Sequence, residues 1–241
     1  LIFCMKKNNI VVTGGEGRFA SILKKEKTNF KVFYPNKREL NILDIESIKK
    51  FIRKTKPKYL IHLAGLSRPM ELHVKDISKS IDLNIIGTSN ITKVCNQFNI
   101  KLIYFSTNFV YPGRKGNYKE TDPILPYNNY AWSKLGGECA VQMYKNSLIL
   151  RVSMTEYPFI HKQAFYDVKN NFLFHKDVAS IVFKVLSKKG VINIGAKTST
   201  IYSFAKKHNP KIKKLSAKKI FSKLYPVNQD MNVSKMNKIL K

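Results

Sequence analysis

Hydrophobic and polar positions along the first 151 residues predict buried strands separated by amphipathic helices. Short apolar runs end in Gly, Pro or polar residues, which is typical of parallel strands buried on both faces. We expect such strands at residues 9–13, 30–34, 58–63, 101–105 and 147–151. The segments between them have helical periodicity, with helices expected at 18–25, 45–53, 77–98 and 128–144. This alternation predicts an α/β fold with a doubly wound parallel sheet.

The pattern after Arg151 is less regular. We expect a helix at 175–187 and a strand at 190–195. A chain of 241 residues with 44% hydrophobic side chains can bury one substantial core and carry a small additional lobe. We therefore expect a sheet domain over 5–155 and a small, reduced lobe over 156–241, partly interleaved with the sheet domain.

Location and metal binding are constrained by what the sequence contains. No apolar run approaches the ~20 residues that span a bilayer, and residues 1–4 are too short for a signal-peptide core. Met5 is a candidate start. Cys4, Cys95 and Cys139 lack metal-ligand spacing, as do the five histidines, of which His62 reads as a hydrogen-bonded core residue. We expect reduced cysteines, a cytoplasmic location, no membrane partner and no metal.

The charge is strongly positive, with 44 Lys+Arg against 15 Asp+Glu and a formal net charge of +29. Such a field attracts polyanions, including nucleic acids. The basic residues are nevertheless spread over the whole chain, apart from a denser run at Lys206–Lys219, and no zinc-finger, RNA-recognition or basic-zipper pattern accompanies them. We expect no nucleic-acid partner and an advantage in capturing phosphorylated substrates.

A glycine-rich turn, Thr13-Gly14-Gly15-Glu16-Gly17, follows the first expected strand and precedes a helix. Glycines permit close backbone approach, and a helix N-terminus attracts a pyrophosphate. The turn predicts a dinucleotide cofactor. Lys37 and Arg38 follow the second strand, where no acidic residue ends the strand to pair with ribose hydroxyls. A basic residue there can hold a 2′-phosphate, so we favour NADP(H) over NAD(H).

Tyr130 and Lys134 lie one helical turn apart on the same face of an expected helix. A phenol is a poor acid at neutral pH, but an adjacent ammonium favours the phenolate, so the pair can exchange a proton with a hydroxyl or carbonyl. Ser106 and Thr107 end a strand upstream and offer a hydroxyl for the same oxygen. These residues together indicate carbonyl/alcohol redox chemistry.

These motifs resemble the extended short-chain dehydrogenase/reductase superfamily, whose fold is Rossmann-like. The chain is most similar to the dTDP-4-dehydrorhamnose reductases, on the segments Phe105–Gly113, Tyr118–Pro126 and Tyr130–Glu138. The similarity extends from 9 to 153, is patchy from 174 to 206 and is not found after 209.

The resemblance implies a set of cofactor-binding residues. The third glycine of the family's turn is replaced by Ala20, Asp44 would contact the adenine, and Asn84 would support the active-site lysine. Asp44 also reads as a helix N-cap and Asn84 as a packed helix residue. The implied cofactor-binding residues are Gly14, Gly17, Arg18, Phe19, Lys37, Arg38, Asp44, Leu63, Ala64, Gly65, Asn84, Tyr130 and Lys134.

The resemblance also implies the reaction. A reduced nicotinamide would give hydride to C4 of a nucleotide-activated 4-keto-6-deoxy sugar, while Tyr130 gives the proton. Thr107 would hold the carbonyl oxygen, with Ser106 as the alternative, and Lys134 would hold the nicotinamide ribose. Arg151 would brace the site. Asn108 stands where the family has aspartate.

Two alternatives stay open. An NAD-dependent sugar-nucleotide epimerase or dehydratase is the first, although dehydratases of this superfamily have Thr-Asp-Glu where this chain has Thr107-Asn108-Phe109. The second is a non-catalytic, cofactor-binding regulatory subunit, because the methionine adenosyltransferase β subunit is similar to these reductases. The resemblance further implies a homodimer formed through 77–98 and 128–144 as a candidate assembly.

Overall fold

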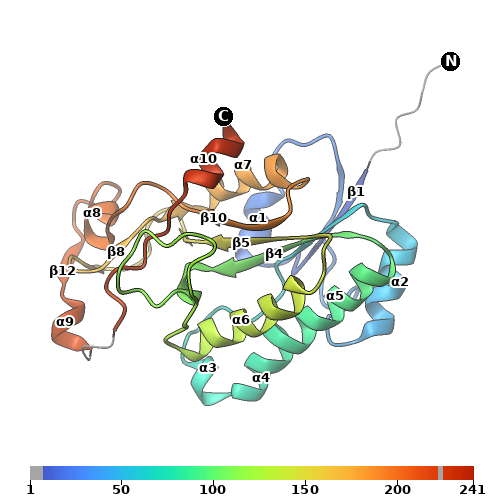
Figure 1. The fold of residues 1–241 in the computed structure, drawn as a ribbon, viewed down its shortest axis with the longest axis horizontal. Helices are drawn as coiled ribbons and strands as arrows, with labels where there is room; N and C mark the ends of the chain where they lie inside the picture. The colour runs from blue at the N-terminus through green and yellow to red at the C-terminus, as the bar shows by residue number, and fades with distance from the viewer. Residues whose placement is uncertain (1–7, 222–224) are drawn as a thin grey trace. The chain divides into compact units, whose positions relative to one another are not determined.

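A six-stranded parallel sheet with the strand order β10-β5-β4-β3-β1-β2 organises the fold of the computed structural model, which describes residues 8–221 and 225–241 (Figure 1). The chain leaves β1 for one edge and returns to its other side at β3, which gives a doubly wound α/β sheet and confirms the expected fold class. The strands are β1 (Asn9–Thr13), β2 (Lys31–Phe33), β3 (Tyr59–His62), β4 (Lys101–Thr107), β5 (Ser147–Val152) and β10 (Gly190–Ile194).

Most of these strands are buried as their sequence predicts, whereas the edge strand β2 has an exposed Lys31 and half-buried Val32 and Phe33. Every residue of β4 and β5 is buried, and β1 pairs with β3 in a parallel register that places Thr13 opposite His62. Strands buried on both faces need continuous apolar sequence rather than alternation. The expected strand positions are therefore confirmed to within a residue or two.

Helices connect the strands and pack their apolar faces inward. In α2, Ile48 and Ile52 are buried, and α2 lies beside α5 (Figure 1). The single helix expected over 77–98 is three pieces, because a π-helical turn, η1, interrupts it. The helices are α1 (Arg18–Leu23), α2 (Ile45–Thr55), α3 (Leu72–Lys75), α4 (Ile77–Ile81), η1 (Asp82–Ile86), α5 (Gly87–Gln97), α6 (Asn129–Gln142) and α7 (His175–Val185).

The rest of the described chain forms short elements, and the sequence pattern did not predict most of these elements. Three two-stranded sheets pair β11 with β8, β12 with β7 and β6 with β9. The elements are the 3₁₀ turn η2 (Asn108–Val110), β6 (Met154–Thr155), β7 (Gln163–Phe165), β8 (Lys169–Asn170), β9 (Leu173–Phe174), β11 (Ser199–Thr200), α8 (Ile201–Lys206), β12 (Lys213–Leu215), α9 (Ala217–Ile220) and α10 (Ser234–Leu240).

The chain divides into two compact units that interleave in sequence. The first is Leu1–Phe105, Gly136–Ile149 and Leu186–Gly190; the second is Ser106–Leu135, Leu150–Val185 and Val191–Lys241. The division into domains 5–155 and 156–241 stays a prediction, and Met5 and Cys4 lie outside the described residues.

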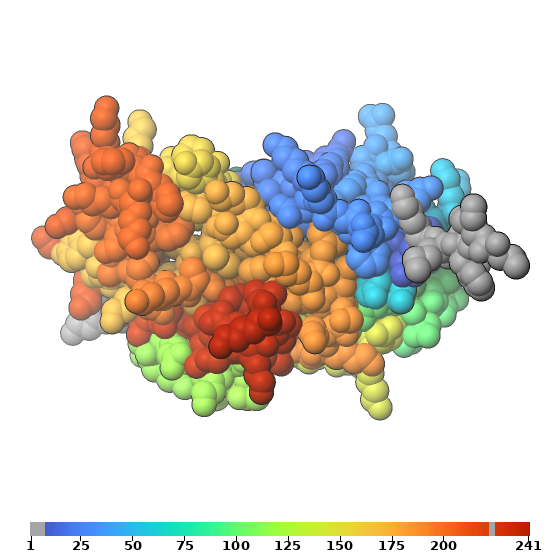
Figure 2. Space-filling view, turned by 90° about the horizontal axis from the view of Figure 1, so that it is seen from above, coloured from blue at the N-terminus to red at the C-terminus, as the bar shows by residue number. Residues whose placement is uncertain are grey.

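The second unit has its own buried clusters. One contains Val110, Tyr111, Tyr118 and Met231, so a C-terminal residue packs into the loop after β4. Within this unit, α10 (red) lies against α7 (Figure 2). No helix in the described part of the chain is long and apolar enough to cross a membrane.

Candidate active site

The glycine turn is held between the ends of β2 and β3. Gly14 has a φ of +68°, and a Cβ there would lie 2.9 Å from the Ala64 backbone. A Cβ on Gly15 would lie 2.9 Å from the Pro35 carbonyl oxygen, and the Gly17 N–H donates to Gly14 O at 2.9 Å. Side chains at Gly14 and Gly15 would therefore push the turn away from the neighbouring strands. The turn presents backbone to whatever binds there.

Helix α1 begins directly after this turn. Arg18 is exposed at its first position, with Nη2 3.5 Å from Ser67 Oγ. Phe19 is buried with its ring 5.1 Å from that of Phe105, and Ala20 is 1% exposed. The small residue at 20 lets the helix pack closely, as the sequence comparison implies. The cofactor-contact roles of Arg18 and Phe19 stay predictions.

A hydrogen-bonded chain ties β1, β3 and α5 together beneath the turn. The Thr13 hydroxyl accepts from the backbone N–H groups of Leu63 and Ala64, each at 3.2 Å, so its own hydrogen is available to His62 Nδ1 at 2.7 Å. His62 Nε2 then donates to Thr88 Oγ1 at 3.1 Å. His62 is 1% exposed, which confirms it as a hydrogen-bonded core histidine.

Three residues expected near the adenosine end of the cofactor lie in loops after strands. Asp44 accepts from the N–H groups of Glu46 and Ser47 and is therefore the N-cap of α2. Lys37 and Arg38 are exposed in a turn after β2, which Asn36 closes by accepting from the Arg38 N–H at 2.9 Å. Their contacts with adenine or a 2′-phosphate stay predictions.

Asn84 fixes the loop that follows β3. Its Oδ1 accepts from the Leu66 N–H at 2.7 Å, and its Nδ2 donates to the Leu66 carbonyl at 2.9 Å. Gly65 gives room for this clamp, because a Cβ there would lie 2.7 Å from Asn84 Oδ1. Asn84 lies in the π-helical turn η1, a distortion that is frequent at functional sites. Its support of Lys134 stays a prediction.

Thr107 and its neighbours lie at the carboxyl end of β4. Ser106 and Thr107 are buried, and Thr107 Oγ1 accepts from the Phe109 N–H at 3.2 Å, which begins η2. Because this contact uses a lone pair, the Thr107 hydroxyl keeps its hydrogen for donation elsewhere.

Asn108 is buried in a network of amides. Its Nδ2 donates to Asn170 Oδ1 and to the Gln229 carbonyl, both at 3.2 Å. Asn170 Oδ1 also accepts from Ser153 Oγ at 2.6 Å and from the Asn171 N–H at 2.8 Å. Position 108 therefore needs a side chain that donates hydrogen bonds. The sequence showed the departure from aspartate but not the partners that require it.

Tyr130 and Lys134 open helix α6. Asn128 starts this helix, since its Oδ1 accepts from the Ala131 N–H at 2.8 Å. Both side chains are half-buried and lie one turn apart on the same helix, as predicted.

A row of aromatic residues that the sequence did not single out extends from Tyr130. The Phe109 ring lies 6.3 Å from that of Tyr130 and 6.1 Å from that of Tyr127, and Tyr225 lies 5.7 Å from Tyr127. Burial raises the pKa of Tyr127 and of Tyr225, so these two phenols stay protonated. Tyr225 is distant in sequence, so no local signal could have identified it.

Arg151 braces the loop after β4, and its bracing of the site itself stays a prediction. It is 3% exposed, and its Nη1 donates to Tyr111 Oη at 2.7 Å and to the Glu120 carbonyl at 3.1 Å. Tyr111 in turn donates to Asn193 Oδ1 at 2.9 Å. Burial raises the pKa of Tyr111 despite the adjacent guanidinium, so Tyr111 is a neutral donor here.

Comparisons with known proteins identify relatives of this chain. Methionine adenosyltransferase 2 subunit beta of Xenopus laevis is 35% identical over 114 residues, which is 47% of this chain and 34% of that protein. The dTDP-4-dehydrorhamnose reductase of Aggregatibacter actinomycetemcomitans is 28% identical over 151 residues, 61% of this chain and 51% of that one. The chain therefore spans about a third to a half of these relatives.

Solved structures share the fold over nearly the whole chain. The dTDP-4-dehydrorhamnose reductase from Bacillus anthracis, in complex with NADP, superposes with a TM-score of 0.85 at 19% identity, covering 96% of this chain and 92% of that one. A family model described as the RmlD substrate binding domain matches residues 8–173, well over half of the sequence. The chain therefore belongs to the RmlD substrate binding domain family.

Proposed function

We propose that the protein is an NADPH-dependent reductase of a nucleotide-activated 4-keto-6-deoxy sugar. The observation that carries the proposal is the placement of Thr107 at the end of β4 and of Tyr130 and Lys134 on one face at the start of α6. These residues lie within the matched family segment, and a family relative is named a dTDP-4-dehydrorhamnose reductase.

The glycine turn suits a dinucleotide pyrophosphate because it lies between the end of β1 and the start of α1, where the backbone N–H groups of a helix N-terminus can face an anion. Gly17, Arg18 and the first turn of α1 would bind the pyrophosphate, and Lys37 and Arg38 would face the 2′-phosphate. When bound, the reduced nicotinamide supplies the hydride.

The chain's own residues would handle the proton and the carbonyl oxygen. The Thr107 hydroxyl, oriented by the Phe109 N–H, would donate to the carbonyl oxygen of the sugar. Tyr130 Oη would donate to the same oxygen and transfer its proton as the carbonyl becomes an alcohol. The Lys134 ammonium would stabilise the resulting phenolate.

The test is NADPH oxidation by the purified protein with dTDP- and UDP-4-keto-6-deoxyglucose. Tyr130→Phe should remove turnover while NADPH, most of whose implied contacts are with other residues, still binds, as followed by fluorescence. Tyr166→Phe is the matched control, because Tyr166 is 46% exposed and lies in another segment. Turnover by Tyr130→Phe at the wild-type rate would exclude Tyr130 as the acid. Protein that purifies with NAD bound and does not consume NADPH would favour the epimerase or dehydratase.

A regulatory subunit is the second candidate, because a 35% identical relative is named a subunit of methionine adenosyltransferase. This function predicts cofactor binding without turnover on any keto-sugar and a co-purifying catalytic partner. In that case Tyr130→Phe would leave the activity of the partner complex unchanged.

A further inference from the structure

The C-terminal part of the sequence carries lysines without acidic residues among them. Between Asp177 and Asp230 the sequence contains twelve lysines and no aspartate or glutamate. Elsewhere acidic residues recur, with eight between residues 8 and 105 alone. The positive charge of this stretch is therefore locally uncompensated, and it is not explained by the high lysine content of the chain as a whole.

The fold gathers many of these lysines onto one group of elements. Figure 1 shows α8, β12 and α9 together in the second unit, and β12 pairs with β7 so that Lys213 lies beside Gln163. We call the exposed lysines of this group the basic face; they are Lys206, Lys207, Lys211, Lys213, Lys214, Lys218 and Lys219.

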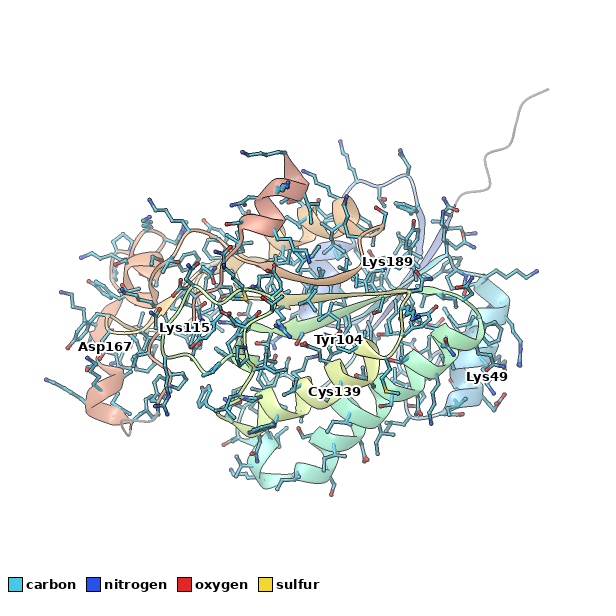
Figure 3. All side chains as sticks on the ribbon, in the orientation of Figure 1. Lys49, Tyr104, Lys115, Cys139, Asp167 and Lys189 are labelled. Carbon is cyan, nitrogen blue, oxygen red and sulfur yellow. The ribbon has the colours of Figure 1, made fainter. Side chains whose placement is uncertain are left out.

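One acidic side chain beside this face is held by hydroxyl and backbone donors at the start of α9. Asp167, labelled beside α9 in Figure 3, accepts from Ser216 Oγ at 2.7 Å and from the N–H groups of Ala217 and Lys218 at 2.8 and 3.2 Å. Its carboxylate is thus directed into the start of α9. The lysine ammoniums of the basic face remain to attract an external anion.

Exposed apolar side chains lie in or next to the same elements. Ile220 follows Lys218 and Lys219 directly and is 54% exposed, and Ile160, before β7, is 55% exposed. Phe221 is 43% exposed. Lysines with exposed apolar side chains between them are typical of surfaces that adsorb to anionic lipid, where ammoniums meet headgroups and apolar groups enter the acyl boundary.

The chemistry favours lipid over nucleic acid. Residues 152–241 contain no arginine, the side chain that best recognises phosphate and base edges with paired hydrogen bonds. Tyr202, which could stack on a base, has the ammoniums of Lys206 and Lys214 at 5.6 and 5.4 Å from its ring centre instead. Phe221 is an exposed ring beside this face, but one side of it is already stacked on Tyr225, with the ring centres 4.2 Å apart. We propose that the basic face, with Ile160 and Ile220, adsorbs the protein to membranes rich in anionic phospholipid.

Such adsorption needs no membrane-spanning helix. It changes one expectation from the sequence, namely that the protein has no membrane partner. It is independent of the proposed reductase activity and is tested without substrate. The full-length protein is sedimented with vesicles of phosphatidylglycerol and phosphatidylcholine in about equal amounts, and with pure phosphatidylcholine vesicles, at about 0.05 M and 0.5 M NaCl. Binding should require phosphatidylglycerol and fall at the higher salt concentration.

Two variants with the same charge locate the contact. Lys211→Gln, Lys213→Gln, Lys218→Gln and Lys219→Gln together leave the Tyr202 contacts intact and should reduce affinity for the anionic vesicles at least ~10-fold at low salt, since each lysine near such a surface contributes about fivefold. The matched control changes Lys25, Lys27, Lys54 and Lys79, four exposed lysines of the first unit, to Gln and should retain affinity within about twofold. Ile160→Ser with Ile220→Ser should weaken the binding that persists at high salt.

The proposal is overturned if the wild-type protein binds neither vesicle or binds both equally, or if the control variant loses as much affinity as the basic-face variant. Salt-sensitive binding of a single-stranded oligonucleotide that depends on the same four lysines, without binding to phosphatidylglycerol, would assign the face to nucleic acid instead. Circular dichroism of all variants checks that each one is folded.

Discussion

Substituting Asn108 by aspartate, the residue that resembling reductases have, should destabilise this protein. The Asn108 Nδ2 donates to two carbonyl oxygens, Asn170 Oδ1 and Gln229 O, each at 3.2 Å. In Asn108→Asp an ionised carboxylate would face both acceptors with no hydrogen to share. Asn170 Oδ1 retains its contacts with Ser153 and Asn171, so the main effects are repulsion and two lost hydrogen bonds.

The size of the effect follows from these contacts. Two lost hydrogen bonds remove about 2 kcal/mol, and a buried carboxylate oxygen without a donor adds about 1–3 kcal/mol. The total, roughly 3–5 kcal/mol, is a large part of the 5–15 kcal/mol typical of a folded domain. At about 2–4 °C per kcal/mol for a chain of this size, the Tm should fall by about 6–20 °C at pH 8.

The pH dependence distinguishes this cause from a simple packing defect. A protonated carboxyl can donate one hydrogen bond to either carbonyl, so folding should raise the pKa of the new carboxyl above its unfolded value. The folded state then holds more protons, and the stability of N108D relative to wild type should fall as pH rises above about 4. Thermal unfolding followed by circular dichroism at pH 5 and pH 8 measures this. Asn237→Asp, at an exposed position of α10, is the control. Equal stability of N108D and wild type at pH 8, or a Tm difference that grows at pH 5, would refute the explanation.

Further predictions concern other parts of the fold. Gly137→Ala should lower the free energy of unfolding by about 1–3 kcal/mol in urea unfolding. A Cβ at 137 would lie 2.8 Å from the Tyr104 hydroxyl (Tyr104 is labelled in Figure 3) and closer still to the Asn84 carbonyl. Gly136→Ala is the control and should be near neutral, because the Cβ meets the Ile85 side chain rather than backbone. Burial and the charge of Lys189 lower the pKa of Lys101 to about 8, so the unfolded chain binds more protons between about pH 8 and 10.5. The stability of wild type relative to Lys101→Met should therefore rise over that range, and a flat difference would contradict it. Burial raises the pKa of Asp167, but hydrogen bonds from Ser216 and the α9 backbone outweigh it and lower the pKa overall. The extra stability of wild type relative to Asp167→Asn should therefore be lost as pH falls below about 3.8. A stability difference that does not change with acid would show that these hydrogen bonds do not favour the ionised form.

The strands and the helices that follow them could be predicted because their signals are local. A parallel strand buried on both faces needs an uninterrupted apolar run, and β1, β3, β4 and β5 each have one. Tyr130 and Lys134 could be identified because both residues of the motif lie on one helix. The cap at Asn128 is likewise adjacent in sequence to the helix it starts.

What the sequence did not show depends on distant contacts. The π-helical turn η1 accompanies Asn84, which binds the Leu66 backbone, a partner 18 residues away. The two- and three-residue strands exist only through their pairing partners, since such short runs have no periodicity. Gln229 meets Asn108 across 121 residues, beyond the segment with any resemblance. The local sequence pattern carries no information about contacts between residues so far apart in the chain.

The asparagine at 108 is therefore weak grounds for regarding this chain as a degenerate enzyme. Its amide is matched by Asn170 and Gln229, so the neutral residue and its partners form one consistent arrangement. Thr107 keeps its hydroxyl hydrogen, and neither it nor Tyr130 requires a charge at 108 for the proposed proton transfer. The variant that separates a reductase from a subunit of another enzyme is therefore one at Tyr130, not one at Asn108. N108D should alter stability under either function, whereas Tyr130→Phe should alter turnover only if the protein is a reductase.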